Sequence, residues 1–91
     1  MLSGYNREIP MKAYVTVMLK TTVLDPQGKT IQGALKKMGY KGVNAVRQGK
    51  FFEIALAPGV TKEQAQKDID SIARDVLTNP VIEDYQIEIA E

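Results

Sequence analysis

The order of the periodic segments is the feature that most restricts what this chain of 91 residues can fold into. Residues 12–20 alternate apolar and polar side chains with a period of two and are rich in β-branched residues, as in a half-buried strand. Residues 85–90 alternate in the same way near the other end. Two amphipathic segments and one long apolar segment lie between them. The predicted order is therefore strand, helix, strand, strand, helix, strand.

The first amphipathic segment carries signals for both ends of a helix. Asp25 is a typical N-cap residue, and Pro26 suits the first helical position because its missing N–H needs no partner there. Gly39 readily adopts the positive φ that follows many helices. Apolar residues spaced three and four positions apart predict one buried stripe: Ile31, Ala34, Leu35 and Met38.

The second amphipathic segment begins and ends equally clearly. Thr61 with Gln64 three residues later forms a capping-box pattern, and Asn79 followed by Pro80 predicts the end of the helix. The residues expected to point inward are again apolar: Ala65, Ile69, Ile72 and Val76.

The apolar segment 43–57 is longer than a typical strand and contains Gln48, Gly49 and Lys50 at its middle. Because glycine adopts positive φ at little cost, a β-hairpin that turns at these residues is predicted. A single strand with a bulge is the alternative.

This order predicts an α+β fold of the ferredoxin-like β-α-β-β-α-β type, a two-layer sandwich with two helices on one face of an antiparallel sheet. Residues 11–91 form the expected domain, and residues 1–10 are expected to be a flexible extension. The face without helices would carry Tyr14, Thr16, Met18 and Phe51, which is apolar enough to predict docking on another protein and at least a homodimer. The sequence leaves dimer and tetramer open.

Composition excludes several classes of function. Cys and His are both 0, so no thiol or imidazole is present for nucleophilic catalysis or for metal binding, and we expect no catalytic residues, no metal and no cofactor in this chain. The net charge of +1, without a basic stripe, argues against nucleic acid. No segment approaches the ~20 apolar residues of a membrane span, so the expected location is cytoplasmic.

Three motifs carry a family resemblance: residues 24–28 (LDPQG) before the first helix, residues 46–50 (VRQGK), and residues 79–85 (NPVIEDY) before the last strand. In this order they resemble the PurS family, the small accessory subunit of phosphoribosylformylglycinamidine (FGAM) synthase. The resemblance extends over nearly all of residues 11–91. It implies a non-catalytic subunit of de novo purine biosynthesis that forms homodimers or homotetramers. It also implies that ATP and Mg²⁺ bind to a partner and not to this chain.

The implied partners are a PurL-type synthetase and a PurQ-type glutaminase, which this chain would bridge to support glutamine-dependent conversion of FGAR to FGAM. The alternative function is an ACT-like regulatory domain that binds a small molecule near the loop after the first strand. Asn79 and Pro80 either fix the last strand for pairing with a second copy or simply end a helix. The candidate interface residues are Tyr14, Thr16, Met18, Arg47, Lys50, Phe51, Asn79, Pro80 and Tyr85.

Overall fold

The computed structural model describes residues 11–91, so the predicted extension, residues 1–10, lies outside the described residues. The elements in chain order are β1 (Lys12–Leu19), α1 (Pro26–Lys37), β2 (Gly49–Ala55), α2 (Lys62–Ile72), a π-helical turn η2 (Ala73–Leu77) and β3 (Glu83–Ala90). The α+β class predicted from the sequence is confirmed.

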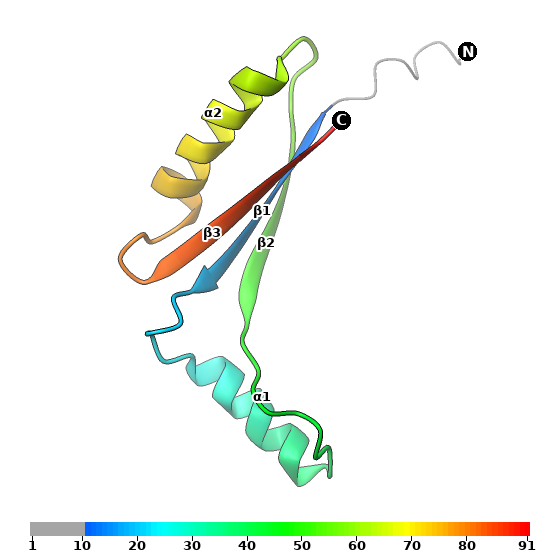
Figure 1. Ribbon diagram of the computed structural model, residues 1–91, viewed down its shortest axis with the longest axis vertical. Coiled ribbons are helices and arrows are strands. Elements are labelled where there is room, and N and C mark those ends of the chain that lie inside the picture. The colour runs from blue at the N-terminus through cyan, green and yellow to red at the C-terminus, as the bar shows by residue number, and fades with distance from the viewer. Residues whose placement is uncertain (1–10) are drawn as a thin grey trace, which may run out of the picture.

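The strands form one antiparallel sheet in the order β2-β1-β3, with β1 in the middle (Figure 1). Val15 of β1 lies opposite Phe52 of β2 and Ile87 of β3, so these three side chains share what we call the inner face. The even-numbered residues of β1 lie on the opposite, outer face. The alternation in the sequence therefore assigns the two faces of the sheet correctly.

The core lies where α2 packs on the inner face. Its fully buried members come from β1, α2 and η2: Ala13, Val15, Val17, Ile69 and Ala73. Half-buried apolar side chains surround them: Phe52, Ile54, Leu56, Ile72, Leu77, Tyr85, Ile87 and Ile89. Because α2 lies closest to β3, it leaves Phe52 and Ile54 of β2 only partly covered.

The ends of α1 form as the sequence predicts. Asp25 caps the helix by accepting a 2.9 Å hydrogen bond from the backbone N–H of Gly28. Gly39 has φ 94°, and the N–H of Tyr40 reaches back to the carbonyl oxygen of Leu35 at 3.1 Å, which is the Schellman ending. Local capping chemistry therefore fixes the length of this helix.

The position of α1 differs from the prediction, because only α2 covers the sheet. In Figure 1 α1 projects away from the strands, and residues 38–48 return beside it to β2; we call residues 26–48 the arm and the remaining elements the body. Gly28 is the only buried residue of α1. The radius of gyration is 18.1 Å, whereas a compact domain of this length has about 12 Å. Each large apolar side chain of α1 left in water forgoes roughly 1.5–3 kcal/mol of burial free energy.

The predicted hairpin at Gly49 does not form, so the described chain has three strands rather than four. Within residues 11–91, positive φ occurs only at Gly39 and Gly59. The chain therefore passes through Gly49 without turning back, and residues 43–48 lie along α1 instead of pairing with β2. Gly49 is required by close packing, because a Cβ there would lie 2.5 Å from the carbonyl oxygen of Val17.

The end of the second helix also departs from the prediction. After the expected N-cap, in which Thr61 Oγ1 accepts from the N–H of Gln64 at 3.1 Å, regular α-helix ends at Ile72 and η2 follows. A π turn has a wider hydrogen-bond spacing and shifts the side-chain register. Val76, expected to point inward, is therefore 74% exposed, whereas Ala73, four residues after the buried Ile69, is still fully buried.

Candidate interaction surfaces

The outer face of the sheet brings together the four residues that the sequence singled out there. Tyr14 and Phe51 stack with ring centroids 5.7 Å apart, and Thr16 lies directly opposite Phe51 in the strand register. Met18 follows at the end of β1, opposite Gly49. Phe51 is 65% exposed, and α2 packs on the other side of the sheet. Glu53 and Glu88 flank Tyr14 in the register, and Gln86 lies opposite Thr16, so the face combines a small aromatic pair with polar side chains. Such a mixed surface can dock a partner.

A second arrangement, the junction between arm and body, centres on Asp25. One carboxylate oxygen accepts the N–H of Gly28, and the other accepts the N–H of Gln48 at 2.9 Å. These bonds, that to Gln48 first, lower the pKa of Asp25 below its usual value. One side chain therefore ties the start of α1 to the chain that returns toward β2.

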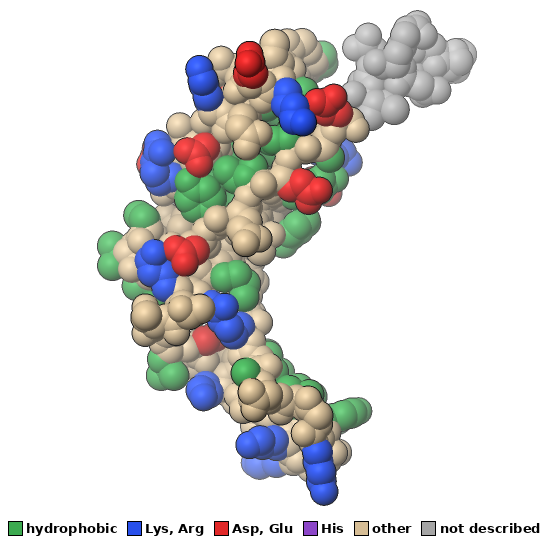
Figure 2. All heavy atoms as spheres, in the orientation of Figure 1, with side chains coloured by type: hydrophobic (Ala, Val, Ile, Leu, Met, Phe, Trp, Pro, Cys, Tyr) green, Lys and Arg blue, Asp and Glu red, His purple; other side chains and the backbone are tan. Residues whose placement is uncertain are grey.

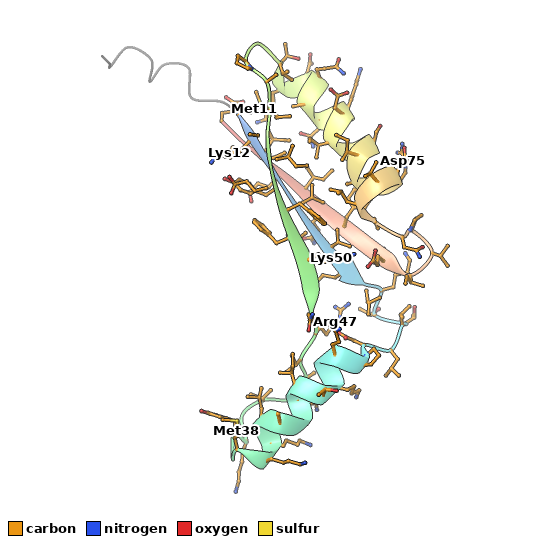
Figure 3. All side chains as sticks on the ribbon, turned by 180° about the vertical axis from the view of Figure 1, so that it is seen from behind. Met11, Lys12, Met38, Arg47, Lys50 and Asp75 are labelled. Atoms are coloured by element: carbon orange, nitrogen blue, oxygen red, sulfur yellow. The ribbon has the colours of Figure 1, made fainter. Side chains whose placement is uncertain are left out.

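Arg47 contributes to the same junction rather than to a hairpin tip. Its guanidinium donates to the carbonyl oxygen of Leu19 at the end of β1. Gly28 packs so tightly that an added Cβ would lie 2.2 Å from the carbonyl oxygen of Val46. Figure 3 shows Arg47 where the arm meets β2. Two side chains and one tight backbone contact thus set the direction of the arm.

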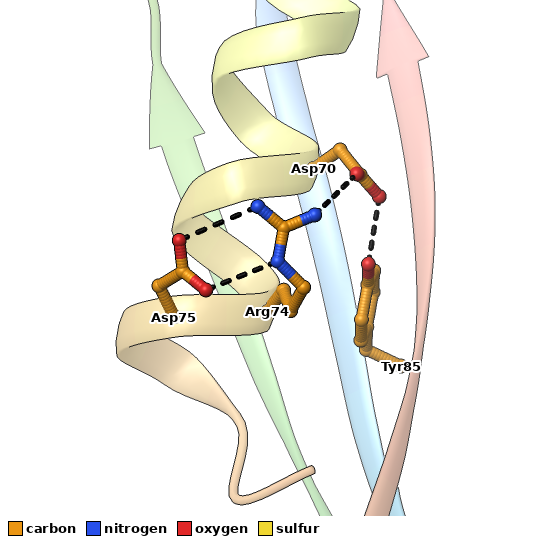
Figure 4. A network of polar contacts seen from close by, with 4 residues as sticks. All are labelled: Asp70, Arg74, Asp75 and Tyr85. Carbon is orange, nitrogen blue, oxygen red and sulfur yellow. Dashed lines mark hydrogen bonds and ion pairs between the residues drawn. The ribbon is translucent and has the colours of Figure 1, made fainter.

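Lys50 and Tyr85 lie on the inner face, away from the stacked pair. Lys50 is labelled at the lower end of β2 in Figure 3, and its Nζ lies 3.7 Å from a carboxylate oxygen of Glu83. The hydroxyl of Tyr85 donates to Asp70 at 2.7 Å (Figure 4). That hydrogen bond, together with desolvation, raises the pKa of Tyr85. Tyr85 therefore joins β3 to α2.

The Asp70 carboxylate that accepts from Tyr85 also contacts Arg74 on the next helical turn. Figure 4 shows the Arg74 guanidinium between two acidic residues, with nitrogen–oxygen distances of 3.4 Å to Asp70 and 3.0 Å to Asp75. The network is at the surface, so each ion pair contributes little to stability. It links the last turn of α2 to the first residues of η2 and to β3.

Asn79 and Pro80 form the turn into β3. Asn79 Oδ1 accepts from the N–H of Val81 at 3.1 Å, and the N–H of Asn79 donates to Glu83 Oε1 at 2.7 Å. Both residues are exposed. The turn therefore fixes where β3 begins, at an edge of the sheet.

Sequence reasoning found Asp25 as a cap but missed its second partner. The hydrogen bond from Gln48 joins residues 23 positions apart, and periodicity and capping rules describe only near neighbours. One sequence signal could have suggested this bond. Residues 24–28, which contain Asp25, and residues 46–50, which contain Gln48, are two of the three motifs that carry the family resemblance. In residues 11–91 no group of His, Cys, Asp and Glu side chains is arranged to hold a metal ion. The helices of that same stretch are too short and too polar to cross a membrane.

Known proteins resemble this chain over almost its whole length. The family model PurS, phosphoribosylformylglycinamidine (FGAM) synthase, matches residues 12–91. The PurS subunit of this synthase from Mycobacterium leprae is 43% identical over 76 residues, covering 84% of this chain and 91% of the relative. The subunit from Bacillus subtilis is 40% identical over 84 residues, covering 88% and 93%.

Solved structures give the same result. The crystal structure of PurS from Methanocaldococcus jannaschii has a TM-score of 0.80 and 34% identity, covering 89% of this chain and 96% of that one. A chain of the PurLQS structure from Thermotoga maritima has a TM-score of 0.77 and 27% identity, covering 88% and 98%.

Proposed function

The chain belongs to the PurS family of FGAM synthase subunits, and we propose from this membership that it is the accessory subunit that bridges synthetase and glutaminase in purine biosynthesis. The bridge supports glutamine-dependent conversion of FGAR to FGAM. The observation that carries the proposal is the likeness to a chain of the PurLQS structure from Thermotoga maritima, which covers 88% of this chain. In this assembly the PurL-type partner is the synthetase and the PurQ-type partner is the glutaminase.

The chemistry belongs to the partners in this proposal. With Cys and His both at 0, this chain lacks the side chains that most amide-transfer chemistry uses, so glutamine hydrolysis falls to the glutaminase. ATP and Mg²⁺ bind to the synthetase. The contribution of this chain is to hold two active sites in one complex, in the cytoplasm.

The outer face of the sheet is the surface we propose for protein contacts. It carries the stacked Tyr14 and Phe51 beside Thr16 and Met18, and it can serve a large subunit or a second pair of copies in a homotetramer. Of the other expected interface residues, Asn79 and Pro80 are exposed at the start of the edge strand β3. Arg47, Lys50 and Tyr85 make contacts within the chain, so we assign them supporting roles.

The test compares two nitrogen donors. FGAM formation by the matching synthetase and glutaminase is measured with ATP and Mg²⁺, with and without this chain, first with glutamine and then with ammonium salt. We expect omission to lower glutamine-dependent turnover at least about tenfold, equivalent to ~1.4 kcal/mol, and to leave ammonia-dependent turnover by the synthetase in place. Equal glutamine-dependent rates, with no co-elution of the three chains, would refute the bridging role.

One observation favours the ACT-like regulator as a second candidate. An open hollow of about 400 Å³ lies after β1, lined by Thr21, Leu24, Asp25 and Gln32 among others, where that alternative needs a ligand. A ligand that binds only the folded chain must raise its melting temperature. We expect no saturable shift with any of the twenty amino acids, and a shift with one of them would favour the regulator.

A further inference from the structure

The side of α1 that faces away from its apolar stripe is basic. Three lysines lie three or four positions from Gly33 and therefore surround it on one side of the helix: Lys29, Lys36 and Lys37. These lysines and the glycine are all exposed. The stripe residue Ile31 is only two positions from Gly33, so it lies on the opposite side of the helix. We call the three lysines and Gly33 the basic face of α1.

The lysines of the basic face have no acidic partner within residues 11–91. No ion pair in that part of the chain includes them, whereas most cations of the body lie within 3.7 Å of a carboxylate oxygen: Lys12, Lys20, Lys50, Lys62 and Arg74. The arm contains five Lys or Arg and no Asp or Glu, whereas residues 49–91 contain nine Asp or Glu and four Lys or Arg. Figure 2 shows this separation of charge, with basic side chains and no acidic ones on the lower arm.

The helix dipole accounts for only part of this charge. Lys36 and Lys37 are in the last turn of α1, where the free carbonyl groups favour cations. Lys29 is near the start of the helix, where the dipole disfavours a cation. The position of Lys29 therefore calls for a reason outside the helix.

No contact within the described chain requires glycine at position 33. A Cβ added to Gly33 would meet no atom within 4 Å, unlike a Cβ added to Gly28, which would clash with the carbonyl oxygen of Val46. Glycine inside a helix also destabilises the fold relative to alanine. What glycine offers at an exposed helical site is room for another backbone to approach closely. The glycine and the lysines around it thus point to a molecule that packs on this face.

The charges of the chain narrow the choice of that molecule. A second copy offers few free carboxylates, because most of those in its described residues already lie within 3.7 Å of a Lys or Arg of their own chain: Glu53, Asp70, Asp75, Glu83, Asp84 and Glu91. A nucleic acid longer than the arm would also run along the acidic body and be repelled there. A bridging subunit, by contrast, must contact two large proteins, and the outer face of the sheet is one surface only.

We propose that the basic face of α1 docks on an acidic surface of one of the large subunits of the synthase. The three lysines pair with carboxylates of that surface, and Gly33 lets its backbone come close to the backbone of α1. This inference rests on the proposed bridging function and gives the bridge a second surface, separate from the outer face of the sheet.

The first test measures the dissociation constant of the chain with each matching large subunit in turn, the PurL-type synthetase and the PurQ-type glutaminase. Lys29→Glu reverses one charge of the basic face near the start of α1, where an acidic group favours the helix, so the chain should still fold. Lys67→Glu is the matched control, because Lys67 on α2 is also exposed and is in no ion pair within residues 11–91. We expect Lys29→Glu to raise the dissociation constant with one subunit at least about tenfold and to weaken its dependence on salt, and Lys67→Glu to change it less than about twofold.

The outcomes separate this inference from the function on which it rests. A wild-type chain that binds neither large subunit refutes the bridge itself. If the wild-type chain binds and Lys29→Glu binds equally well, the bridge stands and the docking of the basic face is wrong. If Lys29→Glu weakens the homodimer as much as the complex, or if the wild-type chain binds a short RNA more tightly than either subunit, the face belongs to a second copy or to nucleic acid, and the inference is overturned.

The second test separates binding from folding at Gly33. Gly33→Ala adds a methyl group where the chain itself leaves room, so the melting temperature should rise. The same methyl group should hold the partner's backbone away from α1 and raise the dissociation constant with that subunit at least about fivefold. A variant that is more stable and binds as tightly as wild type would show that nothing approaches Gly33 closely, which contradicts the proposed docking.

Discussion

At the scale of residues, the junction shows which details the sequence could predict. Asp25 and Gly39 were predictable because capping signals involve residues three to five positions apart. The requirement for glycine at position 28 was not predictable. It comes from the close approach of the carbonyl oxygen of Val46, and no residue near position 28 in the sequence indicates that contact. Long-range backbone contacts of this kind are visible only once the chain has folded.

Replacing Gly28 by alanine should destabilise the chain. Its Cβ would lie 2.2 Å from the carbonyl oxygen of Val46, so the arm must shift, and we expect a loss of about 1–3 kcal/mol in the free energy of unfolding. Gly33→Ala in the same helix meets no atom within 4 Å and should stabilise by about 0.5–1 kcal/mol. Urea unfolding measures both. Equal effects of the two substitutions would contradict the tight junction.

The Asp25 carboxylate should make stability depend on acid pH. Its pKa is lowered in the folded state, so its stabilising effect is complete above the pKa of an unfolded aspartate, about 3.9, and is lost as the pH falls through the lower folded pKa. Asp25→Asn should therefore be less stable than wild type at neutral pH, with the difference shrinking between about pH 4 and pH 2. Denaturant midpoints across this range test it. A difference that stays constant would exclude the lowered pKa as the cause.

At the scale of elements, the periodic signals predicted the existence of helices and strands better than their partners. Both helix starts and the strands β1 and β3 lie where the sequence placed them. The hairpin failed because alternation identifies a strand-like segment but not the strand it pairs with. Val76 was misplaced because η2 changes the helical spacing, and no residue type there announces a π turn.

The contact between β3 and α2 can be tested by removing a single oxygen atom, the hydroxyl oxygen of Tyr85. Tyr85→Phe removes the hydroxyl that donates to Asp70 at 2.7 Å, and we expect a loss of about 0.5–1.5 kcal/mol of unfolding free energy. Tyr40→Phe is the control, because Tyr40 is 54% exposed on the arm, and its effect should fall within about 0.5 kcal/mol. If Tyr85→Phe leaves the free energy of unfolding unchanged, water replaces the hydrogen bond at no cost in stability.

At the scale of the molecule, the open shape of 53 × 34 × 15 Å leaves two partly apolar surfaces in water, the outer face of the sheet and the stripe of α1. The outer face should govern the association of copies into a homotetramer. Phe51→Glu puts a charge where a ring 65% exposed stacks on Tyr14, so we expect it to abolish any tetramer and to leave the dimer intact. Sedimentation measures the oligomeric state of the Phe51→Glu chain, and Val81→Glu, at a body residue that is 78% exposed, is the control. A Phe51→Glu chain that becomes monomeric would place the primary pairing on the outer face.

The separation of charge between arm and body has a consequence for the conditions under which the chain works. Lys and Arg supply all the basic side chains and Asp and Glu all the acidic ones, with no histidine or cysteine between them. None of these groups titrates near neutrality at its ordinary pKa. The electric dipole that the side-chain charges produce is therefore nearly constant across the physiological range of acidity. A cell that acidifies or turns alkaline would leave this separation of charge in place, and only ionic strength would screen it.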